Sequence, residues 1–290
     1  MKEVIVIVGP TGVGKTKLSI ELAKMLDAEI INGDSVAIYK GLNIGSAKPT
    51  VEEREGIVHH LIDIREVTDN YSVFDYQKDV RKLIDNISNR NKRVIIVGGT
   101  GLYIKAALYN YQFSISDNYN DYKDMSNQKI FDKLLKYDNN LNIHVNNRQR
   151  LVRLLNKYEN NEVITSNKDE LLYPCKVIGL TTDRSYLYER INNRVDEMIN
   201  NNLLDEIDGL RKYYNNSRIL NSAIGYKEFY DYLFNNKSLL QVVEEIKMHS
   251  RRYAKRQYTF FKHQFNTKWF DVDFRNFNNT IREIYNYIEK

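Results

Sequence analysis

Residues 9–16 read GPTGVGKT and match the pattern G-x-x-x-x-G-K-[ST], which is typical of a phosphate-binding loop. In such a loop the backbone amides and the N-terminus of the following helix point at phosphate oxygens. Lys15 adds a point charge, and the Thr16 hydroxyl can ligate magnesium. A buried-strand pattern at residues 4–8 precedes the match, and leucines spaced four residues apart follow it. The match therefore predicts a phosphate site and leaves open which phosphate compound is bound.

Two further polar clusters come directly after apolar runs. Asp34 follows the run at residues 29–31, where its side chain could act as a general base or a substrate ligand, or could simply cap the next segment. The GGTG segment at residues 98–101 follows another run, where small residues let the backbone and the Thr100 hydroxyl approach a ligand. A plain turn is the alternative for this second cluster.

The run at residues 93–97, RVIIV, ends without the acidic residue that holds magnesium in P-loop ATPases. A motor or switch ATPase is therefore disfavoured. Small-molecule kinases and transferases that hold a pyrophosphate remain.

A basic segment near the C-terminus carries the charge that could bind a polyanion. Residues 247–262 contain six Lys or Arg and no Asp or Glu, whereas the whole chain has a net charge of only +5. Aromatic residues are interleaved with these charges, although some of them must be core residues at helical spacing. The segment could be a solvated helix face or a nucleic-acid footprint.

The elements that must position these residues follow an α/β pattern. Strands are expected at residues 4–8, 29–31, 57–64, 93–97, 175–180 and 269–270, and helices at 15–26, 185–214 and 238–263. Strands that alternate with helices predict a doubly wound, P-loop NTPase-like parallel sheet with flanking helices and ligands at the carboxyl ends of the strands. Residues 113–172 are rich in Asn, Asp, Lys and Tyr and predict a helical insertion into a core of residues 1–112 and 173–290.

Composition favours an ordinary globular protein of the cytoplasm. Hydrophobic residues make up 42% and charged residues 28% of the chain, and the single cysteine, Cys175, excludes an internal disulfide. The N-terminal apolar stretch of five residues is too short for a signal peptide or a membrane span. We expect a cytoplasmic monomer that does not contact membranes.

The motifs, taken in order, resemble those of the tRNA dimethylallyltransferases, or tRNA isopentenyltransferases, over nearly the whole chain. The matching segments are GPTGVGKT, NGDSVAIYKGLNIGSAKP, HHLIDI, YSVFDY, VIIVGGTGLYIKAAL, NNRQRLVRLL, LYERINNRVDEM, SAIGYKE and HSRRYAKRQYTFFKHQ. The chain departs from the family at Val145, where a proline is frequent, and at Phe260, where a tryptophan is frequent.

The resemblance implies transfer of a dimethylallyl group from dimethylallyl diphosphate to N6 of adenosine 37, next to the tRNA anticodon. The tRNAs would be those reading codons that begin with U, and the products would be N6-(dimethylallyl)adenosine and diphosphate. The loop would hold the diphosphate of the prenyl donor, with Mg²⁺ as cofactor. The anticodon stem-loop would be the RNA partner, clamped by the insertion and the basic segment.

The resemblance also implies roles for particular residues. Asp34 matches the general base and Thr100 its partner near the reacting amine, while Thr16 would ligate the metal. The diphosphate would be bound by Gly9, Pro10, Thr11, Gly12, Val13, Gly14, Lys15, Thr16 and Arg194, the last preferred over Arg190. Four segments would contact tRNA: Asp34, Ser35, Val36 and Ala37; Gln149, Arg150, Leu151, Val152 and Arg153; Ser222, Ala223, Ile224, Gly225, Tyr226 and Lys227; Lys255, Arg256, Gln257, Tyr258, Thr259, Phe260, Phe261 and Lys262.

Three rival interpretations remain at this point. A P-loop small-molecule kinase uses the same loop and strand-end acid but needs no tRNA-sized basic surface. An adenylate isopentenyltransferase would modify free AMP or ADP, which makes the basic C-terminal half superfluous. A non-catalytic RNA-binding module would bind RNA in a salt-dependent way without forming a product.

Overall fold

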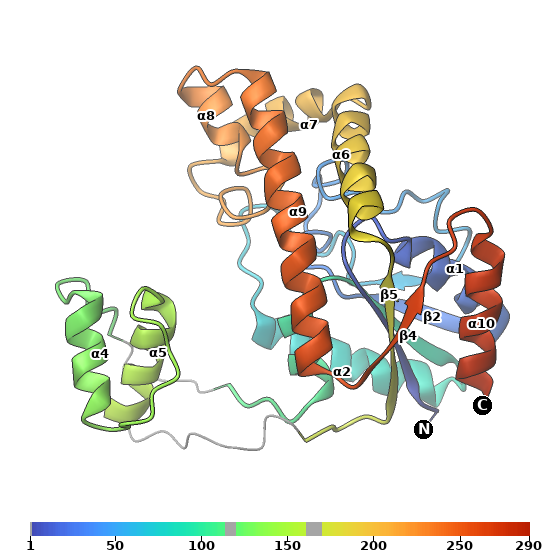
Figure 1. The fold of residues 1–290 in the computed structure, drawn as a ribbon, viewed down its shortest axis with the longest axis horizontal. Helices are drawn as coiled ribbons and strands as arrows, with labels where there is room; N and C mark the ends of the chain where they lie inside the picture. Colours follow the sequence, from blue (N-terminus) through green and yellow to red (C-terminus); the bar gives the residue numbers. More distant parts are fainter. Residues whose placement is uncertain (1, 114–119, 161–169) are drawn as a thin grey trace. The chain divides into compact units, whose positions relative to one another are not determined.

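The computed structural model describes residues 2–113, 120–160 and 170–290 (Figure 1). The chain divides into two compact units. The larger unit comprises Met1–Tyr109 with Leu171–Lys290, and the smaller unit is Asn110–Glu170. The helical insertion was predicted at residues 113–172, close to the limits of the smaller unit.

A parallel sheet forms the centre of the larger unit and confirms the predicted α/β class. Within the described residues it has six strands in the order β3-β2-β4-β1-β5-β6, and every neighbouring pair is parallel. The strands are β1 (Val4–Val8), β2 (Ala28–Asn32), β3 (His59–His60), β4 (Arg93–Val97), β5 (Cys175–Thr181) and β6 (Thr267–Asp271).

The strand predicted at residues 57–64 is much shorter in the structure. Of this stretch only His59–His60 form a strand, β3, which pairs with β2 at the edge of the sheet. Leu61 and Asp63 both have positive φ angles, 61° and 57°, so the backbone leaves the extended conformation directly after the strand.

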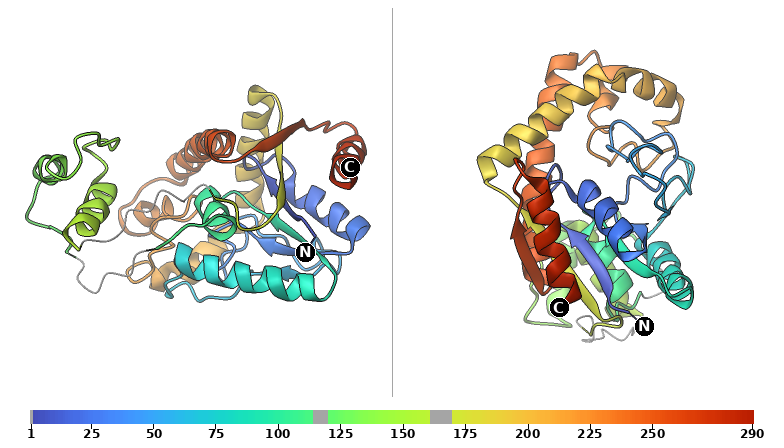
Figure 2. Two further views of the ribbon diagram at one scale, coloured as in Figure 1. Left: turned by 90° about the horizontal axis from the view of Figure 1, so that it is seen from below. Right: turned by 90° about the vertical axis from the view of Figure 1, so that its right-hand side faces the viewer.

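Helices cover both faces of the sheet and its carboxyl edge (Figures 1 and 2). In the larger unit they are α1 (Lys15–Leu26), α2 (Val73–Asn89), α3 (Gly101–Leu108), α6 (Arg184–Asn200), α7 (Leu203–Leu210), the 3₁₀ turn η2 (Arg211–Tyr213), α8 (Phe229–Phe234), α9 (Leu239–Gln264) and α10 (Phe277–Glu289). Ser72 and Ser238 each accept a hydrogen bond from the amide three residues later, which fixes the start of α2 and of α9.

The core has two halves, one on each face of the sheet. Successive side chains of a strand point to opposite faces, so Val4, Val6 and Val8 of β1 join one apolar cluster and Ile5 and Ile7 join the other. All five side chains are buried, as expected for a strand that is covered on both faces.

The prediction of a single helix at residues 185–214 was wrong. Helix α6 ends at Asn200, and Asn202 adopts a left-handed conformation with φ 65° before α7 begins. Asparagine tolerates this conformation better than most residues, so Asn201 and Asn202 end the first helix.

The smaller unit contains α4 (Asn127–Leu135) and α5 (Arg148–Glu159) among its described residues. Their facing apolar side chains form a core of their own, which includes Ile130, Leu134, Leu151 and Leu155. In neither unit does a described helix have the length and apolar character needed to cross a membrane.

Candidate active site

The phosphate loop has the conformation that its glycines allow. Gly9 has φ 139°, and a Cβ atom there would lie 2.6 Å from the carbonyl oxygen of Leu180 on β5. Helix α1 begins at Lys15, directly after the loop. The Nζ atom of Lys15 donates to the carbonyls of Gly9 at 2.9 Å and Pro10 at 2.7 Å, so the ammonium group lies over its own loop.

Two cations, Lys15 and Arg194, lie close together at this loop, and no carboxylate among the described residues forms an ion pair with either. Burial lowers the pKa of Lys15 to about 7, and the nearby charge of Arg194 contributes to the shift. Burial also lowers the pKa of Arg194. The Arg194 guanidinium donates to the Thr11 hydroxyl at 3.3 Å and to the carbonyl of Ala47 at 3.4 Å. A bound anion would relieve both desolvated charges, so the chemistry of the loop suits an anionic ligand.

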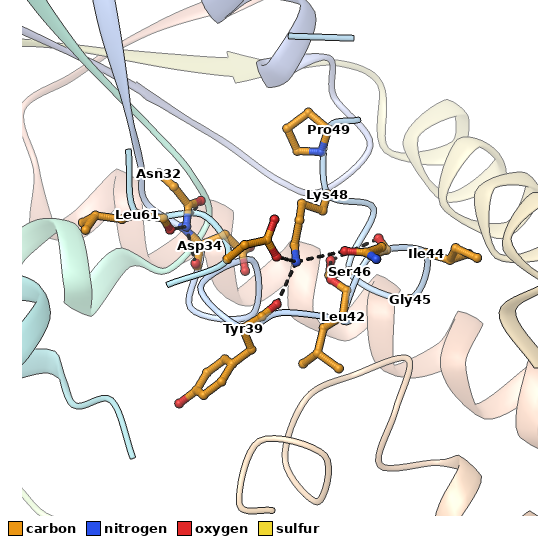
Figure 3. Close-up of polar contacts among 12 residues, drawn as sticks. Asn32, Asp34, Tyr39, Leu42, Ile44, Gly45, Ser46, Lys48, Pro49 and Leu61 are labelled. Carbon is orange, nitrogen blue, oxygen red and sulfur yellow. Dashed lines mark hydrogen bonds and ion pairs between the residues drawn. The ribbon is translucent and has the colours of Figure 1, made fainter. Parts of the chain in front are cut away.

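Asp34 stands at the carboxyl end of β2, where the sequence predicted it, and Asn32 fixes its backbone (Figure 3). The Asn32 side chain accepts from the amide of Asp34 at 3.0 Å and donates to its carbonyl at 2.8 Å. The Asp34 carboxylate accepts from the amide of Val36 at 2.8 Å, as in the capping alternative. One Asp34 oxygen therefore has a structural partner while the residue still lines both cavities described below.

Thr100 forms hydrogen bonds with Ser35, the residue that follows Asp34. Its hydroxyl accepts from the amide of Ser35 at 3.0 Å and donates to the Ser35 hydroxyl at 3.2 Å. Gly98 permits this approach, because a Cβ atom there would lie 2.1 Å from the carbonyl carbon of Gly33. The GGTG segment thus serves to bring the ends of β2 and β4 together.

Helix α9 reaches the same place from the C-terminal part of the chain. The Gln257 side chain accepts from the amide of Thr11 at 2.9 Å and donates to the carbonyl of Gly99 at 3.1 Å. Tyr253, one turn earlier, donates to the Gly99 carbonyl at 3.3 Å, and burial raises its pKa to about 12. The predicted basic helix is therefore anchored to the phosphate loop.

Two cavities meet at these residues, and both belong to the larger unit. The larger has a volume of about 660 Å³ and includes the phosphate loop; the smaller, about 300 Å³, lies against α6, α9 and residues 222–227. Both cavities are lined by Thr11, Asp34, Ser46 and Arg194. An anion in the larger cavity and a second ligand in the smaller one would meet beside the Asp34 carboxylate.

The family model described as IPP transferase matches residues 37–264 of this chain. The chain belongs to the IPP transferase family. It is 44% identical to the tRNA dimethylallyltransferase of Anoxybacillus flavithermus over 99% of this chain and 96% of that relative. The family predicted from the motifs is thereby confirmed.

Solved structures of IPP transferases have the same fold. A tRNA isopentenylpyrophosphate transferase from Staphylococcus epidermidis is 39% identical, with a TM-score of 0.77 over 100% of this chain and 99% of that one. A eukaryotic dimethylallyltransferase described as acting on tRNA is 28% identical, with a TM-score of 0.84 over 98% of this chain and 78% of that one.

The residues that the sequence predicted as RNA contacts of an IPP transferase differ in exposure. Some have buried side chains and can act only by holding their segments: Ala37, Leu151, Val152, Ala223, Tyr226, Gln257 and Phe261. Others present exposed side chains: Gln149, Arg150, Arg153, Ser222, Lys255, Arg256, Thr259 and Lys262. Those at 149–153 lie on α5 of the smaller unit, and the rest belong to the larger unit.

Sequence reasoning missed three contributors to this site. Asn32 holds Asp34, Tyr253 lines the smaller cavity, and Ala47 accepts from Arg194. Tyr253 precedes Gln257 by four residues on α9, so helical spacing could have placed both on one face. No local pattern pointed to Asn32 or Ala47, because their roles depend on contacts with other segments.

Proposed function

We propose that this protein transfers a dimethylallyl group from dimethylallyl diphosphate to the N6 amine of an adenosine in the anticodon loop of tRNA. The position expected is adenosine 37 in tRNAs that read codons beginning with U, and the second product is diphosphate. The observation that carries the proposal is the junction of two cavities at Asp34 and Arg194. A kinase-like loop on one side and a strand-end acid shared with a second cavity suit a two-substrate transfer.

The larger cavity suits the diphosphate of the prenyl donor. Loop amides, Lys15 and Arg194 present positive charge to the leaving group, and charge on that group grows as the carbon–oxygen bond breaks. The Thr16 hydroxyl lines the same cavity and is a hard oxygen donor of the kind that Mg²⁺ accepts together with phosphate oxygens and water. Bound there, Mg²⁺ would add charge stabilisation of the leaving diphosphate.

The smaller cavity suits the nucleobase. The N6 amine of adenine is a weak nucleophile because its lone pair is delocalised into the ring. Asp34 would accept the N6 proton as the carbon–nitrogen bond forms, and Asn32 holds the backbone that carries the carboxylate. Residues 222–225, Lys227, Tyr253 and Arg256 line this cavity, and a base extruded from a loop could stack there.

The test is mass analysis of tRNA nucleosides after incubation of the protein with dimethylallyl diphosphate, Mg²⁺ and unmodified tRNA. We expect one new nucleoside that is heavier than adenosine by the dimethylallyl group, together with stoichiometric diphosphate. Parallel reactions with ATP and small acceptors, and with AMP or ADP as prenyl acceptors, test the kinase and adenylate alternatives. Product in either of those reactions without modified tRNA would reject the proposal.

A further inference from the structure

Lys48 lines the larger cavity, yet its ammonium group is turned to the protein (Figure 3). Its Nζ atom donates to the carbonyl of Tyr39 at 2.7 Å and to the side-chain oxygen of Asn43 at 3.1 Å. It also forms an ion pair with Asp63 at 2.5 Å, and the Lys48 side chain is only 3% exposed. A lysine ammonium has three donors, and all three are used. Lys48 therefore has no donor left for a phosphate unless the surrounding loop opens.

The loop that Lys48 holds borders both cavities. Ser46 lines both of them, and Ala47 accepts from Arg194 through its carbonyl. Ala47 has φ 51°, in the left-handed region that a side chain with a Cβ atom disfavours. Such a conformation persists only where neighbouring contacts over-determine it.

Contacts on both sides of Ala47 supply that constraint. On its C-terminal side, Lys48 ties the loop to Asp63 after β3. On its N-terminal side, the Glu206 carboxylate of α7 accepts from the amides of Asn43, Ile44 and Gly45 at 2.9–3.2 Å. The carbonyl of Ala47 is aimed at Arg194 between these two anchors.

We propose that Lys48 is a positioning residue for the transfer reaction: by tying the loop of residues 42–49 to Asp63, it places Ala47 so that Arg194 is held for the diphosphate. This role rests on the proposed function. It differs from the role that a lysine in an anion cavity suggests, which is direct contact with phosphate. Lys48 acts through Ala47 and Arg194, and the diphosphate contacts Arg194.

The role is tested with inorganic pyrophosphate as the probe, titrated calorimetrically into the wild type and three variants. Lys48→Met removes the ammonium at similar length. Asp63→Asn removes only the charge of the partner; Asp63 lines neither cavity, and Asn tolerates its left-handed backbone. Lys40→Met is the matched control, because Lys40 lies just before this loop and forms an exposed ion pair with Glu66.

We expect Lys48→Met and Asp63→Asn each to weaken pyrophosphate binding by about tenfold, and the double variant to be no weaker than either, since both act on one network. Lys40→Met should bind as the wild type does. In turnover, the KM for dimethylallyl diphosphate should rise by a similar factor with little change in the KM for tRNA. A variant that merely loses folded protein lowers kcat and binding stoichiometry and leaves these constants unchanged.

Two results would overturn the positioning role. Weak binding in Lys48→Met with wild-type binding in Asp63→Asn would make Lys48 a direct ligand. Wild-type binding in both would leave Lys48 without influence on the anion site. Failure of the proposed function is distinguishable, because wild-type protein would then bind pyrophosphate without forming a prenylated tRNA nucleoside.

Discussion

The side chain of Gln257 on α9 accepts a hydrogen bond from the amide of Thr11 at 2.9 Å. The same side chain donates to the carbonyl of Gly99 at 3.1 Å, and Gln257 as a whole is only 4% exposed. The phosphate loop, the GGTG segment and the basic helix are thus joined through one amide group. A shift of α9 would therefore change the geometry of the phosphate loop.

Replacement of Gln257 tests this junction. Gln257→Leu leaves the Thr11 amide without its acceptor, and an unsatisfied buried polar group costs about 1–3 kcal/mol. We expect the free energy of unfolding in urea to fall by about 2 kcal/mol and pyrophosphate binding to weaken. Lys262→Gln, at an exposed position of the same helix, is the control and should change neither quantity. Equal stability of wild type and Gln257→Leu would contradict the assignment.

Asp34→Asn separates chemistry from structure at the proposed base. The amide oxygen of asparagine can still accept from Val36, so the turn after β2 should persist. Asparagine cannot accept the N6 proton, and we expect kcat to fall by about 100-fold or more. Single-turnover assays with labelled dimethylallyl diphosphate measure the rate, and filter binding measures tRNA affinity. A rate near that of the wild type would remove Asp34 as the base; loss of tRNA binding would point to a structural role.

Lys15 should make anion binding depend on pH. Burial and Arg194 lower its pKa to about 7, and a bound diphosphate favours the charged form and raises the pKa again. Binding above pH 7 should therefore take up a proton, and affinity should fall as pH rises from 7 to 9. Without ligand, Lys15 is less readily protonated in the folded than in the unfolded chain, so its penalty on stability is greatest below pH 7 and diminishes above it.

Calorimetry at pH 8 in two buffers of different ionisation enthalpy measures this proton uptake. Lys15→Arg is the matched control, because its guanidinium stays charged throughout. Protonation of the pyrophosphate itself is common to both proteins and cancels in the comparison. The same proton uptake in wild type and Lys15→Arg would contradict the lowered pKa.

Glu206→Gln tests the second anchor of the loop at residues 42–49. The two carboxylate oxygens accept from three backbone amides and from the Tyr226 hydroxyl, the last at 2.7 Å. A glutamine would present an NH₂ group to some of these donors, so we expect stability to fall by about 2–3 kcal/mol. Tyr226→Phe removes only one donor and should cost about 1 kcal/mol. Denaturant unfolding measures both losses of stability. If Tyr226→Phe lost as much stability as Glu206→Gln, or more, the backbone amides would not depend on Glu206.

Features that depend on local pattern could be predicted from the sequence. β-branched runs predicted β1 and β4 at their observed limits, and the loop pattern placed Lys15 at the start of α1. Asp34 could be placed at the carboxyl edge because a side chain after a parallel strand has few other positions. The order of the motifs indicated the family, which the comparisons confirmed.

Local pattern failed where helix propensity and packing compete. The periodicity of residues 185–214 continues across Asn201 and Asn202, so it predicted one helix instead of α6 and α7. The strand prediction at residues 57–64 was too long for a similar reason. An apolar run indicates burial, but the backbone turns at Leu61 and Asp63, which have positive φ angles and form hydrogen bonds with Asn32 and Ala37. Only the assembled fold decides between such outcomes.

Tertiary structure alone decided how the site is held together. Gln257 lies 246 residues from Thr11 in sequence, and Glu206 lies 163 residues from Asn43, so no local pattern could connect them. The charge run on α9 predicted a surface, yet the helix has a buried face that carries Gln257. The sequence indicated no role for Lys48; its three hydrogen bonds, which only the fold supplies, make its charge a constraint on the loop.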